Sequence, residues 1–359
     1  MIEFADVFSV HEFDLGNFTA IEHAIDTGDA TPVKQKFRRT PTSFEGEEEK
    51  HLEKMLKADV IEPSMSEWAS SPVLVRKRDG SVRWCVDYRA LNKVTKKDVF
   101  PLPLIEECID TFAGNMWFSK LDATWGYWQI KVKDNDKCKT AFTTKYGLFQ
   151  FKRMSFVLTN ASSTFSRVMN LVLRGLHWKT VLAFLDDVLV LGQSFQDHLQ
   201  NLADVFQRFR EYEIKLKAKK CDLFRTKVEY LGRTVGRNGM KISKHFLNTM
   251  QKWQAPNCSK EVERFCGFAN YHRNFIKRFA EISTPLYSIT GKNKFQWEQE
   301  HQDAFEKLKS ALCSAPYLPY LQRRADLFWI QMHLKLQLEL NYLKYKMERN
   351  AAYRIVVFL

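Results

Sequence analysis

Two adjacent carboxylates, Asp186 and Asp187, interrupt an otherwise apolar run from Val181 to Leu191. Burying an unpaired negative charge is costly, so we predict strands over 181–185 and 188–191 with the two aspartates in the tight turn between them. Only a turn lets both carboxylates approach one site, because neighbouring side chains on a strand point to opposite faces. Such a tip is a candidate Mg²⁺ site. The alternative is a plain turn, in which aspartate is common.

A third carboxylate, Asp122, ends a predicted strand that begins at Trp117. An acid at a strand end can lie beside a hairpin tip in a folded sheet. Three carboxylates can hold two divalent ions about 3.5–4 Å apart, the spacing used for in-line phosphoryl transfer. We therefore expect Asp122, Asp186 and Asp187 to be the catalytic and metal-binding residues, with two Mg²⁺ ions as cofactors and Mn²⁺ as a possible substitute.

Long, ordered segments of this chain resemble the reverse transcriptases of Gypsy-type LTR retrotransposons (Metaviridae), which are parts of Pol polyproteins. The run Phe184–Asp187 is similar to their Tyr/Phe-x-Asp-Asp box, and Phe118–Ile130 is similar to the box with their first catalytic aspartate. Val75–Asn92 resembles a segment of their fingers. Three shorter matches are 101–103, 152–154 and 158–161. The matches follow the family's order from about residue 1 to about residue 320.

The resemblance implies an α+β right-hand polymerase, with fingers, a palm whose antiparallel sheet is backed by helices, and a helical thumb. The expected parts are an N-terminal segment (1–60), fingers (61–97 and 130–160), palm (98–129 and 161–238), thumb (239–290) and the start of a connection (291–320). The tail at 321–359 diverges from the family: Phe328–His333 lacks the carboxylate of the family's next strand, and Leu334–Leu359 resembles no part of it. We therefore expect the ribonuclease H domain to be missing and the element to be truncated.

The order of elements around the carboxylates itself predicts an antiparallel sheet backed by two helices. One helix is expected near 105–113, a second over 162–173 before the carboxylate hairpin, and a third over 195–212 after it. Helical spacing in the third predicts five core residues. They are Leu199, Leu202, Val205, Phe206 and Phe209.

A basic hairpin is expected in the fingers. Asp79-Gly80 is a strong turn signal between strands over 72–75 and 82–86, which places Lys77 and Arg83 near its tip. Arginine can donate as a fork and lysine acts as a point charge, so the tip could clamp a triphosphate. The alternative is a solvated basic turn.

The resemblance also implies a pocket for the incoming nucleotide. Tyr127 lies five residues after Asp122, where the family has an aromatic wall that excludes a 2′-hydroxyl, and Phe156 occupies a position that packs near the nucleotide. The alternative for Tyr127 is a buried aromatic beside Trp125 and Trp128, and both interpretations can hold together.

The nucleotide-facing segment departs from the family at three positions. The family pattern is Met-Pro-Phe-Gly-Leu-x-Asn-Ala-Pro, and this chain has Ser155, Val157 and Ser162 in place of the first proline, the glycine and the last proline. Valine cannot match the close approach or the dihedral angles of glycine, and loss of two prolines loosens the backbone. We expect Val157, a candidate nucleotide-binding position, to weaken nucleotide binding.

Nucleic-acid contacts are expected farther along the chain. Tyr230-Leu231-Gly232 resembles the family's primer grip, and Arg264, Arg273 and Lys277 lie in the thumb segment that follows the nucleic-acid backbone. Lys219 and Lys220 fall where the family has a lysine thought to protonate pyrophosphate, although they could equally be surface lysines.

Composition supports an intracellular protein with a polyanionic partner. The formal net charge is +13, and the 7 cysteines have wide spacing without Cys-x-x-Cys, which disfavours a disulfide framework or a zinc site. No signal peptide and no apolar run of about 20 residues is visible, so we expect a cytoplasmic or nuclear protein without a membrane partner.

The sequence thus predicts an RNA-directed DNA polymerase, a nucleotidyltransferase whose partners are an RNA template, a DNA primer and dNTP substrates. The alternative is a catalytically inactive retrotransposon remnant that binds RNA or RNA–DNA duplex. A two-metal nuclease of another fold is disfavoured because it leaves the fingers and thumb segments unexplained. The sequence leaves the oligomeric state open.

Overall fold

The computed structural model describes residues 2–41, 44–76, 82–101, 103–291, 293–316 and 318–320. The chain forms two compact units. Unit 1 comprises Met1–Leu104 and Gly114–Tyr230, and unit 2 comprises Ile105–Ala113 together with the chain from Leu231 onward. Within the described residues, no helix is both long and apolar enough to cross a membrane.

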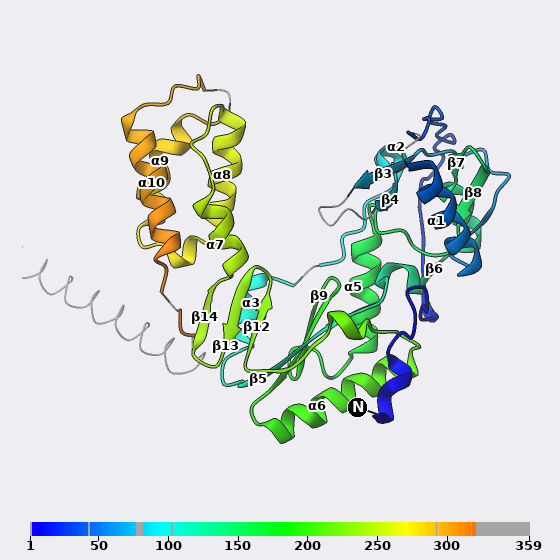
Figure 1. Cartoon of the computed structure of the whole chain (residues 1–359), viewed down its shortest axis with the longest axis horizontal. Coiled ribbons are helices and arrows are strands. Elements are labelled where there is room, and N and C mark those ends of the chain that lie inside the picture. The colour runs from blue at the N-terminus through cyan, green and yellow to red at the C-terminus, as the bar shows by residue number, and fades with distance from the viewer. Residues whose placement is uncertain are drawn as a thin grey trace, which may run out of the picture. The chain divides into compact units, whose positions relative to one another are not determined.

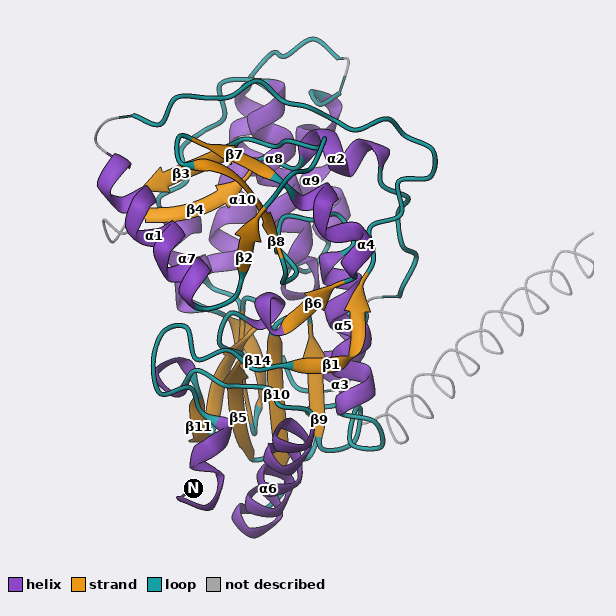
Figure 2. Ribbon diagram, turned by 90° about the vertical axis from the view of Figure 1, so that its right-hand side faces the viewer, coloured by secondary structure: helices purple, strands orange, loops and turns teal. Residues whose placement is uncertain are grey.

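A four-stranded antiparallel sheet in the order β11-β5-β10-β9 organises unit 1 (Figure 2). α6 packs against β10 and β5, and α5 packs against β9. The bounds are β5 (Trp117–Asp122), α5 (Ala161–Val172), β9 (Val181–Phe184), β10 (Asp187–Gly192), α6 (Phe195–Glu211) and β11 (Asp222–Arg225). The predicted antiparallel sheet backed by two helices is therefore confirmed.

The rest of unit 1 consists of shorter strands and helices. The expected basic hairpin is present as β3 and β4, whose turn lies outside the described residues. A three-stranded sheet has the order β2-β8-β7, and β1 pairs parallel to β6. The bounds are η1 (Ile2–Val7), β1 (Phe18–His23), α1 (Glu45–Lys57), β2 (Ile61–Pro63), β3 (Pro72–Arg76), β4 (Val82–Val86), α2 (Arg89–Val94), η3 (Gly126–Gln129), β6 (Ile130–Val132), α4 (Asp134–Lys137), η4 (Cys138–Thr140), β7 (Phe142–Thr144), β8 (Gly147–Phe151), η5 (Ala218–Lys220) and β12 (Lys227–Tyr230).

Unit 2 is mostly helical. α9 and α10 pack against each other, α8 packs against α9, and α7 packs against α10 around an aromatic core in which the rings of Phe265 and Phe305 lie 4.5 Å apart (Figure 1). The bounds are α3 (Ile105–Asp110), β13 (Arg233–Gly236), β14 (Gly239–Ile242), α7 (Lys244–Gln251), α8 (Ser259–Tyr271), η6 (Arg273–Phe275), α9 (Phe279–Ser288) and α10 (Gln299–Cys313). The predicted palm range 98–129 includes α3, which belongs to unit 2. The division into fingers, palm, thumb and connection stays a prediction.

The prediction that Leu199 lies in the core was wrong. Leu202, Val205, Phe206 and Phe209 are buried as expected, but Leu199 is 42% exposed. Residues four apart share one face of a helix, and Leu199 follows Phe195, which is 50% exposed, by that interval. The first turns of α6 instead bury the face that carries His198. Helical spacing alone could not reveal where the sheet stops covering the helix.

Gly192 allows α6 to approach the end of β10. A methyl group at this position would lie 2.4 Å from the Cβ and 2.6 Å from the Cα of His198. We expect Gly192→Ala to lower the free energy of unfolding by about 1–3 kcal/mol, because the helix must shift away from the sheet. Urea denaturation of the full chain measures this change.

Gly267→Ala is the matched control, since no atom lies within 4 Å of a Cβ added there. Gly267 is inside α8, where alanine stabilises a helix by about 0.5–1 kcal/mol relative to glycine. Equal stability changes in the two variants would contradict the close approach at Gly192.

Candidate active site

The pairing of β5 with β10 brings the first and third aspartates together. Asp122 lies directly opposite Asp187 in this antiparallel register. Directly opposed residues project from the same face, with Cβ atoms about 4.5–5.5 Å apart. The predicted meeting of these two carboxylates, which are far apart in the sequence, is therefore confirmed by the strand register.

Asp186 reaches the same place from the hairpin turn. Phe184 pairs with Asp187, so the two turn residues are Leu185 and Asp186. The predicted turn is displaced by one residue, because the ladders on both sides of β10 include Asp187. Leu185 has a φ of 54°, in the left-handed region, which costs a residue with a Cβ about 1–2 kcal/mol. The sharp turn thus holds Asp186 next to Asp187 at a cost in backbone strain.

The pKa of Asp186 is raised in this carboxylate cluster. Partial burial is the largest cause that raises its pKa above the ordinary value, and the charges of Asp187 and Asp122 raise it further. A backbone hydrogen bond and the charge of Lys120 oppose this rise. The three acids therefore repel one another, and a cation between them would stabilise their ionised forms.

Two lysines provide positive charge at the cluster. Lys120 Nζ lies 2.8 Å from an oxygen of Asp187, and Lys220 Nζ lies 3.0 and 3.2 Å from the two oxygens of Asp122. The sequence analysis did not include Lys120, although alternation along β5 places it on the same face as Asp122. It did include Lys220, whose contact with Asp122 favours a place in the site over a plain surface lysine.

The chemistry of the cluster fits hard divalent cations. In the part of the chain that the structure describes, no three His, Cys, Asp or Glu side chains are grouped so that they could hold a metal ion as they stand. Two of the three carboxylates are instead paired with ammonium groups, and ligand binding would require the lysines to move. Carboxylate oxygens open to solvent are the donors that Mg²⁺ prefers, together with water and substrate phosphates.

Tyr127 lies beside the cluster and is half-buried. Its ring packs at 5.1 Å from the ring of Phe165, which is on α5. Burial is the largest cause that raises the pKa of Tyr127; a hydrogen bond with Ser162 opposes the rise, and the charge of Asp186 adds to it. Tyr127 therefore lies within electrostatic reach of Asp186, and the serine that replaces the family's proline contacts it. Its role as an aromatic wall stays a prediction.

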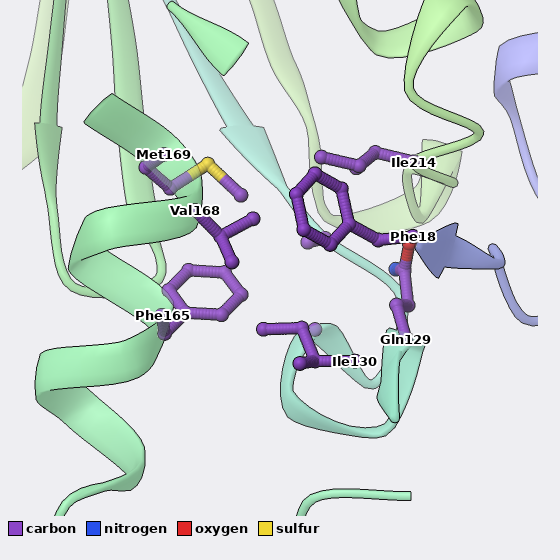
Figure 3. A pocket seen from close by; sticks show the side chains of 9 residues that line it. Phe18, Gln129, Ile130, Phe165, Val168, Met169 and Ile214 are labelled. Carbon is purple, nitrogen blue, oxygen red and sulfur yellow. The ribbon is translucent and has the colours of Figure 1, made fainter. Parts of the chain in front are cut away.

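A small apolar cavity lies between β1 and α5 (Figure 3). Phe165 and Gly126 line it, and a Cβ on Gly126 would lie 3.0 Å from the ring of Phe165. Gly126 thus lets the turn that carries Tyr127 come close to α5. The other lining residues are Phe18, Ala123, Gln129, Ile130, Val168, Met169 and Ile214.

The other predicted nucleotide-binding residues are only partly described. Phe156 is 43% exposed and Val157 is half-buried against the core of unit 1. Lys77 and the side chain of Arg83 lie outside the described residues, although the backbone of Arg83 is in β4.

The predicted nucleic-acid residues in unit 2 are consistent with a surface role. Arg264, Arg273 and Lys277 are exposed. Leu231 and Gly232 both have left-handed φ angles, of 48° and 70°, which indicates a tight turn. The hydroxyl of Tyr271 donates to the carbonyl oxygen of Leu231 at 2.8 Å and fixes this turn. Tyr230, the first residue of the predicted primer grip, is buried in unit 1.

Comparisons with known proteins agree with this geometry. Residues 75–235 match the family described as "Reverse transcriptase (RNA-dependent DNA polymerase)". The chain is 32% identical over 325 residues to the "Retrovirus-related Pol polyprotein from transposon 412" of Drosophila melanogaster, covering 89% of this chain and 26% of that relative. It is 29% identical over 264 residues to the "Transposon Tf2-3 polyprotein" of Schizosaccharomyces pombe, covering 73% and 20%. The chain thus spans only about a quarter of the length of these relatives.

Solved structures show the same fold. The foamy viral protease-reverse transcriptase, solved as its dRH form in complex with double-stranded DNA, matches with a TM-score of 0.81 and 25% identity, covering 90% of this chain and 57% of that chain. The foamy viral protease-reverse transcriptase in complex with an RNA/DNA hybrid matches with a TM-score of 0.78 and 24% identity, covering 89% and 43%. The predicted right-hand polymerase fold is confirmed.

Neutralising Asp186 should stabilise the fold. Because the folded chain holds the pKa of Asp186 above its ordinary value of 3.8, the folded state binds this proton more tightly than the unfolded state. Stability is therefore lost as the pH rises from 3.8 through the raised pKa, and the loss persists at higher pH. We expect Asp186→Asn to raise the free energy of unfolding near neutral pH by less than about 1 kcal/mol, after screening by solvent.

Urea denaturation at several pH values measures this effect. The gain should be absent at acid pH, where the parent carboxyl is protonated, and should reach a plateau above the raised pKa. Asp134→Asn, which changes an exposed carboxylate paired with Lys137 on α4, is the control and should give no such gain. A loss of stability in Asp186→Asn near neutral pH would contradict the repulsion.

Proposed function

We propose that the chain is a member of the reverse transcriptase family and acts as an RNA-directed DNA polymerase of a Gypsy-type LTR retrotransposon. The observation that carries this proposal is the register that sets Asp122 opposite Asp187, with Asp186 in the adjoining turn. The reaction is nucleotidyl transfer from a dNTP to a primer 3′-hydroxyl.

The three aspartates would hold two Mg²⁺ ions, with Mn²⁺ as an alternative. Such a pair of ions supplies charge stabilisation for the attacking and leaving oxygens of an in-line displacement. Lys120 and Lys220 keep the carboxylates compensated when the ions are not bound, since each ammonium group already contacts one aspartate. Lys220 would then lie next to the reacting phosphates, where an ammonium can donate a proton.

The nucleotide would lie between the carboxylates and the loop that carries Phe156 and Val157. Tyr127 borders this space, and its proximity to Asp186 is visible in the influence of that charge on the pKa of Tyr127. Lys77 and Arg83, which the sequence predicts near the tip of the basic hairpin, would contact the triphosphate. Val157 would narrow the space that the family leaves open with glycine, and so weaken nucleotide binding.

An RNA template and a DNA primer are the proposed nucleic-acid partners. The excess of positive charge, formally +13, favours a polyanion. The exposed Arg264, Arg273 and Lys277 would contact phosphates, which position a duplex without reading its sequence. The segment 230–232 would hold the primer end. A cytoplasmic or nuclear location belongs to the same proposal.

Primer extension tests the proposed reaction. We expect the full chain to extend oligo(dT) on poly(rA) with dTTP and Mg²⁺. Asp122→Asn and Asp186→Asn should each reduce extension at least about 10³-fold, because each removes a charged ligand for the ions. Asp134→Asn, at an exposed carboxylate on α4 that pairs with Lys137 rather than with the cluster, is the control and should retain activity.

The same samples distinguish the alternative function. Binding of the poly(rA)·oligo(dT) duplex without extension by the parent chain would indicate a catalytically inactive remnant. The carboxylate cluster opposes that alternative, because acids that face a polyanion weaken binding unless cations lie between them.

Tyr127 should select deoxynucleotides. Replacing its ring in Tyr127→Ala opens space below the sugar, so we expect the ratio of kcat/KM for dTTP over UTP to fall about 10-fold or more. Tyr127→Phe keeps the ring and should retain the selectivity, with loss of the hydroxyl contact to Ser162 only. Unchanged selectivity in Tyr127→Ala would show that another group excludes the 2′-hydroxyl.

A further inference from the structure

The loop from Ser155 to Asn160, which carries Phe156 and Val157, consists of two successive turns. The N–H of Leu158 donates to the carbonyl oxygen of Ser155 at 3.3 Å, and the N–H of Ala161 donates to that of Leu158 at 3.1 Å. These two bonds use neither the carbonyl group of Val157 nor the N–H of Thr159. The junction between the turns therefore needs partners from outside the loop.

The side chain of Asn92 provides both partners. Its Nδ2 donates to the carbonyl oxygen of Val157 at 2.9 Å, and its Oδ1 accepts from the N–H of Thr159 at 2.9 Å. Only a side-chain amide offers a donor and an acceptor held in one plane. Asn92, on α2, thus holds the loop through one donated and one accepted hydrogen bond, as the backbone of a neighbouring strand would.

Asn160, in the loop, makes a similar pair of hydrogen bonds to the segment that follows Asn92. Its Nδ2 donates to the carbonyl oxygen of Lys96 at 2.8 Å, and its Oδ1 accepts from the N–H of Asp98 at 3.0 Å. Asn160 is the N-cap residue of α5, a position where asparagine ordinarily accepts a bond from the first helical turn, yet its side chain caps nothing here. The amide instead joins the start of α5 to the segment with Lys96 and Asp98, which lie 64 and 62 residues before Asn160 in the sequence.

An ion pair strengthens the same junction. Arg167, on α5, donates to Asp98 at 2.7 Å, and its guanidinium lies 5.0 Å from the ring centre of Phe100. The carboxylate of Asp98 is only 17% exposed, so this pair is better shielded than an ordinary surface salt bridge. Segment 92–100 and the start of α5 therefore form one joined support for the loop.

This support lies where the chain lacks the stiffening residues of its family. Ser155 and Ser162 stand in place of two prolines, so the backbone itself restricts the loop less. Without those prolines, the loop depends more on the hydrogen bonds of Asn92 and Asn160 for its position.

We propose that Asn92 and Asn160 are positioning residues that hold the loop Ser155–Asn160 against the segment Asn92–Asp98 and so set the position of Phe156 and Val157 for the incoming dNTP. The inference rests on the proposed function, in which this loop faces the nucleotide. It assigns no catalytic role to either asparagine, since neither touches the carboxylate cluster through any contact described above.

Two measurements on the full-length Asn92→Ala variant test the proposal. In primer extension, we expect the KM for dTTP to rise about tenfold while kcat and the Kd for the poly(rA)·oligo(dT) duplex stay within about twofold of the parent. In hydrogen exchange without nucleotide, the amide of Thr159 should lose its protection, because its acceptor is gone. Asn92→Asp keeps that acceptor and should keep the protection of Thr159, while it loses the bond to Val157.

Asn201→Ala is the matched control. Asn201 on α6 donates to the carbonyl oxygen of Leu191 at 2.8 Å, so its loss removes a similar amide contact far from the loop in sequence. It should lower stability without a change in KM or in exchange at Thr159.

The outcomes separate this proposal from the proposed function. An active Asn92→Ala variant with the parent's KM overturns the positioning role, and unchanged exchange at Thr159 overturns the clamp itself. A parent chain that fails to extend the primer overturns the polymerase function, and exchange at Thr159 still decides whether Asn92 holds the loop.

Discussion

Mutual repulsion among three carboxylates is the constraint on which the rest of the structure depends. The ladder between β5 and β10 forces Asp122 and Asp187 to face each other, and the strained turn at Leu185 brings Asp186 beside them. Partial burial contributes most to the raised pKa of Asp186, and the charges of Asp187 and Asp122 add to the rise through this repulsion. Lys120 and Lys220 relieve it in part through direct contacts. A cluster of carboxylates that requires compensating positive charge is suited to bind metal cations together with a phosphate substrate.

Several close contacts position the groups around this cluster. Gly126 allows the turn with Tyr127 to approach α5, and Phe165 backs the tyrosine ring. Amide groups of Asn92 and Asn160 fix the neighbouring loop. These contacts place groups that face the nucleotide on elements whose own positions are set by the sheet and α5, which is what precise orientation of a substrate requires.

Much of this arrangement could be predicted from the sequence, because it follows local patterns. The apolar run around Asp186 indicated a hairpin, and the strand ending in Asp122 indicated a second acid near its tip. Lys120 could have been found by the same alternation. The one-residue displacement of the turn could not be predicted, since it depends on the pairing of β10 with β5. Exposure of Leu199 and the clamp by Asn92 also depend on tertiary contacts, which no local pattern encodes.

The most direct test of the central claim is anomalous X-ray scattering from Mn²⁺ in crystals of the full chain with a primer–template duplex and a dNTP. The account predicts Mn²⁺ peaks about 2.1–2.2 Å from carboxylate oxygens of Asp122 and of the Asp186-Asp187 pair, with Lys120 and Lys220 displaced from them. Peaks elsewhere, with both ammonium groups still on the aspartates, would contradict it.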